Sequence, residues 1–491
     1  MGSSLFRLDA FRWRWSMIAM APLVLAGLSG STLLGQEQAA MGRRPNVLFL
    51  LTDDQRGDTI RALGNSNIET PHLDSLVRRG TSFTRATCAH PLCVPSRAEI
   101  LTGCTGFRNG VHPPRNQPDL ALITWPQAMQ RAGYRTGWVG KWHLAGRPSS
   151  RGYADSVGLF SSGGGQFSPT HPRDYRGTEV TGYRGWIFQT DDRRMFPEQG
   201  IGLTPEINAK FADAAIEFIQ RKSADPFFLH VNFTAPHDPL LIPPGYENKY
   251  DPELIPAPRN FLPRHPFDHG NLEGRDEVLL PWPRTKELVQ RDLAAYYAVI
   301  SYLDVQIGRV LKALETSGQR DNTLIVFSSD HGLALGSHGL RGKQNMYEHT
   351  INVPLILAGP GVPANKTCRQ QCYLRDLFPT VCELTGVPIP ETVQGTSLAP
   401  VIAGTKSEVY PFIVGYFQDV QRMIRTDRWK YVWYPQISKQ QLFDLAADPD
   451  ELVNLADDAR YAIEMAQLRE KLFKWLQQHD DPLVVEAKRR P

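Results

Sequence analysis

The stretch at residues 46–55, NVLFLLTDDQ, joins an unbroken apolar run to two adjacent aspartates, Asp53 and Asp54. A short run without alternating polar residues is typical of a strand that is buried on both faces of a sheet. Three further stretches also stop at a charged residue or a histidine: YRTGWVGKWHL at 134–144, PFFLHVNFTAPH at 226–237 and NTLIVFSSDHG at 322–332. We therefore expect an α/β fold in which a mostly parallel sheet lies between layers of helices.

Apolar residues at helical spacing supply the helices that this sheet needs. The clearest stripe runs from Tyr296 to Leu314 and stops before Gly318, which predicts a long helix. Shorter helices are expected at residues 75–79 and 209–220. In an open α/β sheet, ligands bind beyond the carboxyl ends of the strands. If the four strands run parallel, their polar ends meet at that edge.

The polar ends are Asp53 and Asp54, Lys141 and His143, His237, and Asp330 and His331. Taken singly, each has a simpler interpretation, because aspartates after strands often form turns or helix caps. Four similar ends favour a site instead. Three clustered carboxylates would repel one another without a cation, and their hard oxygens suit Ca²⁺, with Mg²⁺ as the alternative. His331 could ligate the ion or contact the substrate, while a tetrahedral zinc site built from histidines elsewhere stays an alternative.

The overall composition is that of a globular protein with balanced charge. The 491 residues include 54 lysines and arginines against 51 aspartates and glutamates, a net charge of +3, so we expect no nucleic-acid partner. This length favours a main domain and a smaller one.

The N-terminal region has the layout of a secretory signal. Arg7, Arg12 and Arg14 precede an apolar run, MIAMAPLVLAGLSG, and a polar stretch follows. Pro22 and several small residues interrupt a run barely long enough for a bilayer, which favours a cleaved signal over a membrane anchor. We expect a signal peptide at residues 1–40, a secreted or periplasmic location, and no membrane attachment after cleavage.

The six cysteines are too few for a disulfide scaffold, and one of them has unusual neighbours. Cys93 lies in HPLCVPSRAEILTG at 90–103, three residues after His90 and four before Arg97. A thiolate nucleophile paired with a histidine is one interpretation, because catalytic thiols need a nearby base. That interpretation gives no role to Pro95 or Arg97, and sulfur is a poor neighbour for an oxygen-ligated cation.

The same stretch resembles the signature of the type I sulfatases, which are formylglycine-dependent hydrolases of the alkaline-phosphatase-like superfamily. The matching residues are Cys93, Pro95, Ser96, Arg97, Leu101, Thr102 and Gly103. The resemblance implies that a maturation enzyme oxidises Cys93 to Cα-formylglycine, an aldehyde. It also implies a smaller C-terminal subdomain that contains a short antiparallel sheet. On this basis we expect a catalytic domain at 44–395 and the C-terminal subdomain at 396–491.

The resemblance extends to the polar strand ends. It implies that a Ca²⁺ ion is held by Asp53, Asp54, Cys93 as formylglycine, Asp330 and His331. The implied catalytic residues are Cys93, Arg97, Lys141, His143, His237 and Lys343. Arg97 would hold the hydrated aldehyde, and Lys141 and Lys343 would offset charge on the sulfate. His237 would protonate the leaving alcohol oxygen, and His143 would accept the remaining hydroxyl proton.

The resemblance implies a sulfuric ester hydrolase, and we expect its substrate to be a sulfated carbohydrate. The sequence motifs in residues 330–349 resemble most those of the iduronate-, choline- and glucosamine-sulfatase branches. Two alternatives stay open: a phosphoester or phosphonate monoester hydrolase of the same superfamily, and a secreted glycan-binding protein without catalysis. The long irregular segments at 160–192 and 236–283 either shape the substrate site or decorate the surface.

Overall fold

The four segments with polar ends form adjacent strands at the centre of one sheet. The computed structural model describes residues 44–112, 119, 121–167, 173–179 and 182–484. The central strands lie in the order β7 (Thr323–Ser329), β1 (Asn46–Thr52), β6 (Phe227–Asn232) and β3 (Arg135–Lys141). Each is parallel to its neighbour, so their carboxyl ends meet at one edge as predicted.

The complete sheet has ten strands in the described part of the chain and is mixed toward its two sides. On one side, β8 (Asn352–Ala358) is antiparallel to β7, and β2 (Gly80–Thr87) is antiparallel to β8. Two short strands, β9 (Lys366–Cys368) and β10 (Cys372–Tyr373), are parallel to β2. On the other side, β4 (Asp155–Ser162) is parallel to β3, and β5 (Trp186–Phe188) is antiparallel to β4. The predicted mostly parallel sheet is confirmed.

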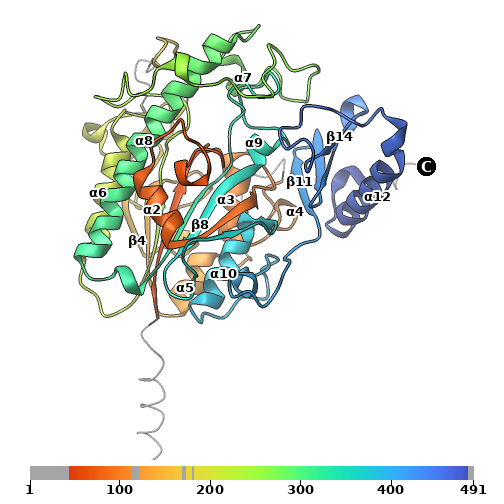
Figure 1. Ribbon diagram of the computed structural model, residues 1–491. Helices are drawn as coiled ribbons and strands as arrows, with labels where there is room; N and C mark the ends of the chain where they lie inside the picture. Colours follow the sequence, from red (N-terminus) through yellow and green to blue (C-terminus); the bar gives the residue numbers. More distant parts are fainter. Residues whose placement is uncertain (1–43, 113–118, 120, 168–172, 180–181, 485–491) are drawn as a thin grey trace, which may run out of the picture. The chain divides into compact units, whose positions relative to one another are not determined.

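Helices cover both faces of the sheet because the strand residues alternate between two cores. Val47, Phe49 and Leu51 of β1 point into one core, and Leu48 and Leu50 point into the other. The first core is covered by α3 (Cys93–Thr102), α5 (Trp125–Arg131) and α10 (Leu377–Leu384). The second is covered by α2 (Pro71–Arg79), α6 (Ile207–Gln220) and α8 (Lys286–Thr316), which Figure 1 shows grouped on one side of the strands. Burial on both faces explains the unbroken apolar runs.

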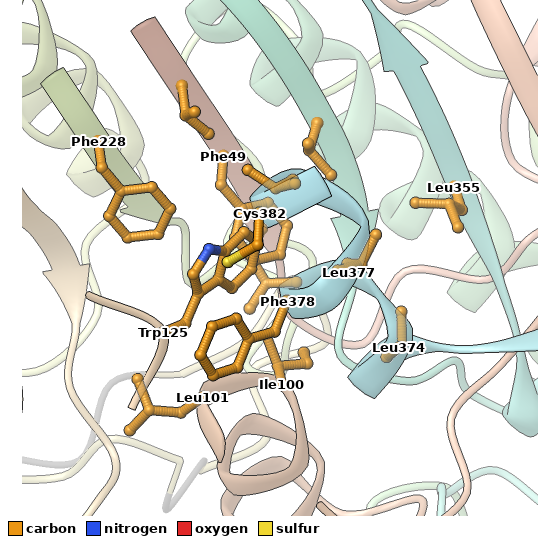
Figure 2. Close-up of a cluster of buried hydrophobic side chains, with 14 of the residues drawn as sticks. Phe49, Ile100, Leu101, Trp125, Phe228, Leu355, Leu374, Leu377, Phe378 and Cys382 are labelled. Carbon is orange, nitrogen blue, oxygen red and sulfur yellow. The ribbon is translucent and has the colours of Figure 1, made fainter. Parts of the chain in front are cut away.

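The first core is built around Trp125, which is 1% exposed at the start of α5. The centre of its ring lies 5.4 Å from that of Phe49, 5.0 Å from that of Phe228 and 6.0 Å from that of Phe378. Figure 2 shows these aromatic side chains together with Ile100 of α3. One indole therefore joins strands β1 and β6 to the helices on this face.

The long helix α8 begins at Lys286, ahead of the stripe that predicts it. The Thr285 hydroxyl caps the helix by accepting the main-chain N–H of Leu288. Val289 and Leu293 continue the buried stripe into this first part. The sequence pattern misses these turns because charged residues interrupt the apolar positions there.

A second, smaller sheet follows in the chain and confirms the expected antiparallel C-terminal sheet. Its strands are β11 (Ile413–Phe417), β12 (Gln421–Arg425), β13 (Trp429–Tyr434) and β14 (Lys439–Asp444), each antiparallel to the next. Helix α12 (Ala462–Gln478) covers one face of this sheet, where Leu468, Leu472 and Leu476 pack near Ile424 and Tyr431.

The remaining helices are short. They are α4 (Gly106–Asn109), α7 (Arg275–Val278), α9 (Glu348–Ile351) and α11 (Ala399–Ile402). Single 3₁₀ turns lie at Arg61–Leu63, Ser149–Arg151, Pro197–Gln199, Pro252–Leu254, Arg320–Asn322, Leu374–Asp376, Pro435–Ile437 and Ala459–Tyr461.

Three further sequence expectations concern the chain as a whole. The six cysteines all lie among the described residues, where each is a buried free thiol. Within the same residues, no helix is both long and apolar enough to cross a bilayer. The predicted signal peptide at 1–40 lies outside the described residues, and the boundary between 395 and 396 stays a prediction.

Replacing Trp125 with alanine is expected to lower the free energy of unfolding by about 3–5 kcal/mol, because the truncation leaves a cavity between strands and helices. Urea unfolding followed by circular dichroism measures the loss. The control is Leu254→Ala, because Leu254 is 77% exposed and its truncation is expected to cost less than about 0.5 kcal/mol. Equal losses in the two variants would contradict the assigned core.

Candidate active site

The pairing of β1 with β7 brings the two acidic strand ends together. The two strands end in register, so Asp53 and Asp54 leave the sheet beside Asp330 and His331. The main-chain N–H of Asp54 donates to Oδ1 of Asp330 at 3.2 Å. All four side chains are fully buried. Asp54 has a φ of 69°, a left-handed conformation that aspartate tolerates better than most residues.

Cys93 faces this acidic group from the first position of α3. Its sulfur lies 3.5 Å from Oδ1 of Asp53, 3.4 Å from Nε2 of His331 and 3.6 Å from Nζ of Lys343. Burial raises the pKa of the thiol, but Lys141, Lys343 and His331 outweigh it and hold the pKa well below its usual value. The surroundings therefore favour negative charge on residue 93.

Four of the five predicted metal ligands form a group that can hold an ion. Each offers one ligand atom, and these atoms all lie within 4.8 Å of one another: Asp53, Asp54, Cys93 and His331. Asp330 is not part of this group, and its carboxylate accepts other hydrogen bonds. Its Oδ2 accepts from Nε of Arg97 at 2.9 Å, and its Oδ1 accepts the main-chain N–H of Asp54.

The chemistry of this group fits a hard divalent cation. Burial raises the pKa of Asp54, and it raises the pKa of Asp330 to about 6. Burial thus disfavours the charged form of these two carboxylates, and a bound cation would favour it. Carboxylate oxygens suit Ca²⁺ or Mg²⁺, whereas the Cys93 sulfur is a poor ligand for both. An oxygen at position 93 would remove that mismatch.

Two buried lysines each bring positive charge to one aspartate. Lys141, the last residue of β3, places its Nζ 2.6 Å from Oδ2 of Asp53. Lys343, in the loop before α9, places its Nζ 2.8 Å and 2.9 Å from the two carboxylate oxygens of Asp54. Burial alone would raise the pKa of Asp53, yet the net pKa is lowered because Lys141 and other nearby cations outweigh it. Both predicted lysines therefore lie in direct contact with the acidic group.

Arg97 connects the cysteine helix to the strand ends. It lies on α3, one turn after Cys93, and its Nη1 donates to Oδ1 of Asn232 at 2.9 Å. Its Nη2 lies 3.5 Å from Oδ1 of Asp53. Among the residues that the structure describes, this Nη2 has no hydrogen-bond partner, so it is the donor that remains for a ligand.

Two histidines in different environments complete the predicted set. Nδ1 of His237 lies 2.6 Å from the main-chain oxygen of Asp238, and its Nε2 lies 3.9 Å from Oδ2 of Asp54. Burial lowers the pKa of His237, but Asp54 and Asp238 outweigh it and raise the pKa to about 9. Burial lowers the pKa of His143, whose ring meets the Trp186 ring edge-on with centres 5.1 Å apart. At neutral pH, His237 therefore favours the protonated form and His143 the neutral form.

Two buried groups at the site are missing from the sequence-based set. The Tyr183 hydroxyl donates to Oδ2 of Asp53, and Asn232 accepts from Arg97. Asn232 is the last residue of β6, so the rule that picks out polar strand ends could have found it. Tyr183 lies in the irregular segment at 160–192, where no pattern distinguishes it.

Arg275 links two of the predicted catalytic residues through carboxylates. Its guanidinium forms ion pairs with Asp238 and Asp276. Oδ1 of Asp238 lies 3.5 Å from Nδ1 of His237, and Oδ2 of Asp276 lies 4.0 Å from Nζ of Lys343. Arg275 therefore helps to position both His237 and Lys343 through these two carboxylates.

A cavity of about 700 Å³ lies at this group and is lined by Cys93, His143, His237 and Lys343. The segment at 160–192 contributes Ser161, Ser162 and Trp186, and the segment at 236–283 contributes His237, Arg275 and Asp276. Both irregular segments therefore shape the site. A second cavity, of about 670 Å³, lies between α2 and α8 near the start of β7 and contains none of the predicted site residues.

Family models match most of the chain. The sulfatase model matches residues 45–387, and the model for the C-terminal part of N-sulphoglucosamine sulphohydrolase matches residues 336–478. An arylsulfatase of Clostridium perfringens is 30% identical over 476 residues, which cover 89% of this chain and 95% of the arylsulfatase.

Solved structures share the fold over a similar length. A structure of a protein in complex with its substrate, D-glucosamine-2-N,6-O-disulfate, has a TM-score of 0.74 at 25% identity and covers 89% of this chain and 99% of its own. The phosphonate monoester hydrolase of Agrobacterium radiobacter has a TM-score of 0.67 at 25% identity and covers 89% of this chain and 96% of its own.

Asp54→Asn is expected to remove the stabilisation that Ca²⁺ gives, because the amide lacks the charge that attracts the ion. In the wild-type protein, after treatment with EDTA, Ca²⁺ at about a hundred times its Kd should stabilise the fold by about 3 kcal/mol. Thermal unfolding with and without added CaCl₂ measures the difference.

The control for this measurement is Asp304→Asn. Asp304 is also buried, but its carboxylate accepts the main-chain N–H groups of His72 and Leu73 at the start of α2. This variant should keep the response to Ca²⁺. A full response in Asp54→Asn would remove Asp54 from the metal site.

Proposed function

The chain belongs to the sulfatase family, and from this premise we propose that it hydrolyses the sulfate ester of a carbohydrate. Because it is a sulfatase-family enzyme, the interpretation as a glycan-binding protein without catalysis is not retained. The observation that carries the proposal is the position of Cys93, which lies in the sulfatase signature, lines the cavity and faces the acidic group.

We propose that residue 93 is Cα-formylglycine in the active protein. The hydrated aldehyde supplies an oxygen nucleophile where the gene encodes sulfur. Cys93 is 3% exposed, so a maturation enzyme needs access to it before α3 packs against the strand ends. Conversion before folding is therefore part of the proposal.

The divalent cation would be held by Asp53, Asp54 and His331 together with residue 93. We propose Ca²⁺ because most of the donors are hard oxygens. When bound, it supplies positive charge beside the sulfate and beside residue 93. Asp330 would hold Arg97 in place through the contact at 2.9 Å.

Lys141, Lys343 and Arg97 surround the position where the sulfate would lie. Nζ of Lys343 is 3.6 Å from the Cys93 sulfur, and Lys141 is among the cations that lower the pKa of that thiol. In a buried site, charges of this kind stabilise an anionic transition state more strongly than they would in water. We assign the two lysines to the sulfate oxygens and Arg97 to residue 93.

His237 and His143 would move the protons of the reaction. The short contact of Nδ1 of His237 with a main-chain oxygen assigns a proton to Nδ1 and leaves Nε2 turned toward Asp54 and the cavity. From that nitrogen His237 would donate a proton to the leaving alcohol oxygen. His143 also lines the cavity and would accept the proton of the remaining hydroxyl.

The carbohydrate substrate is supported by the outer part of the cavity and by one related structure. Ser162, Arg275 and Gln344 provide hydroxyl, guanidinium and amide groups there, which suit a polyhydroxylated ligand. The solved structure with D-glucosamine-2-N,6-O-disulfate shares the fold over nearly its full length. The second candidate is hydrolysis of phosphonate monoesters, which the likeness to the Agrobacterium radiobacter enzyme favours.

A comparison of matched esters separates the two candidates. We expect kcat/KM for 4-nitrophenyl sulfate to exceed that for 4-nitrophenyl phenylphosphonate by at least about tenfold, because an enzyme discriminates by differential binding of transition states. Release of 4-nitrophenol measures both rates, and Cys93→Ala controls for contaminating enzymes. A higher value for the phosphonate would replace the sulfatase proposal by the second candidate.

The state of residue 93 can be read from one tryptic peptide, Ala86–Arg97. We expect the mass of an aldehyde at position 93 in protein from the native host, because the maturation signature is intact. Cys88 in the same peptide is the internal control, and it should react with an alkylating reagent after denaturation. Two alkylated cysteines in a fully active sample would show that formylglycine is not the nucleophile.

A further inference from the structure

A residue of the C-terminal sheet holds an unfavourable backbone conformation at the active-site cavity. Gln418 has a φ of 40°, in the left-handed region that glycine, asparagine and aspartate occupy far more readily. It is the first residue of the loop between β11 and β12, whose flanking residues Phe417 and Gln421 pair across the hairpin. Hairpin loops of this length usually place their left-handed residue last. Neither the turn type nor the residue type accounts for glutamine here.

The backbone of this hairpin is held firmly. The buried Arg422 donates from Nη1 to the main-chain oxygens of Gln418 and Gln421, and its Nε lies 2.5 Å from Oδ2 of Asp481. The side-chain amide of Gln421 donates to the main-chain oxygen of Gln344 at 3.0 Å. The hairpin is therefore fixed to the loop that carries Lys343, and Gln418 occupies a defined place.

The side chain of Gln418 is the part that is left unengaged. Gln418 is exposed and lines the same cavity as Cys93, His237 and Lys343. Within the residues that the structure describes, its amide makes no hydrogen bond. Strained backbone persists where the surrounding structure enforces it, and it gathers at sites that bind ligands.

We propose that Gln418 is a specificity-determining residue whose side-chain amide binds the sugar next to the sulfate ester. This inference rests on the proposed function, because it assigns the amide to the hydroxyl or amino substituents of a sulfated hexosamine. An amide can donate to one such group and accept from another, whereas a bare aryl ring offers neither partner. The C-terminal sheet thereby supplies part of the substrate site, and the left-handed backbone aims the amide into the cavity.

The test compares Gln418→Gly with Ser438→Gly on two kinds of substrate. Ser438 has a φ of 52°, is exposed and lies in the turn between β13 and β14, so its replacement removes a left-handed residue that does not line the cavity. The substrates are 4-nitrophenyl sulfate and a panel of glucosamines that carry a sulfate ester at the 3-O or 6-O position. The ratio of kcat/KM for the best sugar sulfate to kcat/KM for the aryl sulfate is the readout.

We expect Gln418→Gly to lower this ratio about tenfold, the effect of losing one or two hydrogen bonds to the sugar. Ser438→Gly should leave the ratio unchanged, and the thermal midpoints of the two variants should move alike, because both changes place glycine at a left-handed position. An unchanged ratio in Gln418→Gly would overturn the inference. So would a midpoint that falls in Gln418→Gly alone, because the glutamine would then serve the hairpin.

The inference and the proposed function fail in different ways. Wild-type protein that cleaves the aryl sulfate and no sugar sulfate would overturn the carbohydrate substrate and the role of Gln418 together. Wild-type protein that carries the aldehyde at residue 93 and cleaves no sulfate ester would overturn the proposed function itself. A wild type active on both substrates, with an unchanged ratio in Gln418→Gly, would overturn the role of Gln418 alone.

Discussion

Repulsion among buried carboxylates is the constraint on which the rest of the site depends. Parallel strands in register place Asp53, Asp54 and Asp330 together, and all three are fully buried. Lys141 and Lys343 reach them from other parts of the chain. Leaving a buried charge without its partner typically costs about 3–5 kcal/mol, so the strand end and the loop that carry the two lysines are held where the charge is needed. A divalent ion bound among these carboxylates would add further positive charge to the group.

The C-terminal sheet holds segments around the cavity in place through ion pairs and hydrogen bonds. Glu348 of α9, shortly after Lys343 in the chain, accepts from Nη1 of Arg425 on β12 at 2.7 Å and 2.9 Å. Lys430 of β13 lies 2.8 Å from Glu348, and Tyr416 of β11 donates to Glu99 on the cysteine helix. Figure 1 shows this sheet beside α9 and α4. The small sheet thus supports both the lysine loop and the helix that begins at Cys93.

Much of the fold was predictable because burial leaves a pattern in the sequence. The four apolar runs form adjacent central strands because both of their faces are covered; they end at Asp53, Lys141, His237 and Asp330. The first turns of α8 were not predictable from the apolar stripe, because charged residues interrupt it. Tyr183 was not predictable either, since its contact with Asp53 joins residues far apart in the chain.

The sequence by itself determined the chemical groups and the edge of the sheet at which they would meet, because strand periodicity and residue type are local properties. It also contains the signature around Cys93, from which the modification of that residue is predicted. The tertiary structure decided which carboxylates lie together in a group that could hold an ion and which one turns to Arg97. It also decided that Gln418 of a separate sheet lines the cavity. Such contacts depend on how distant segments pack, and no local pattern in the chain records that packing.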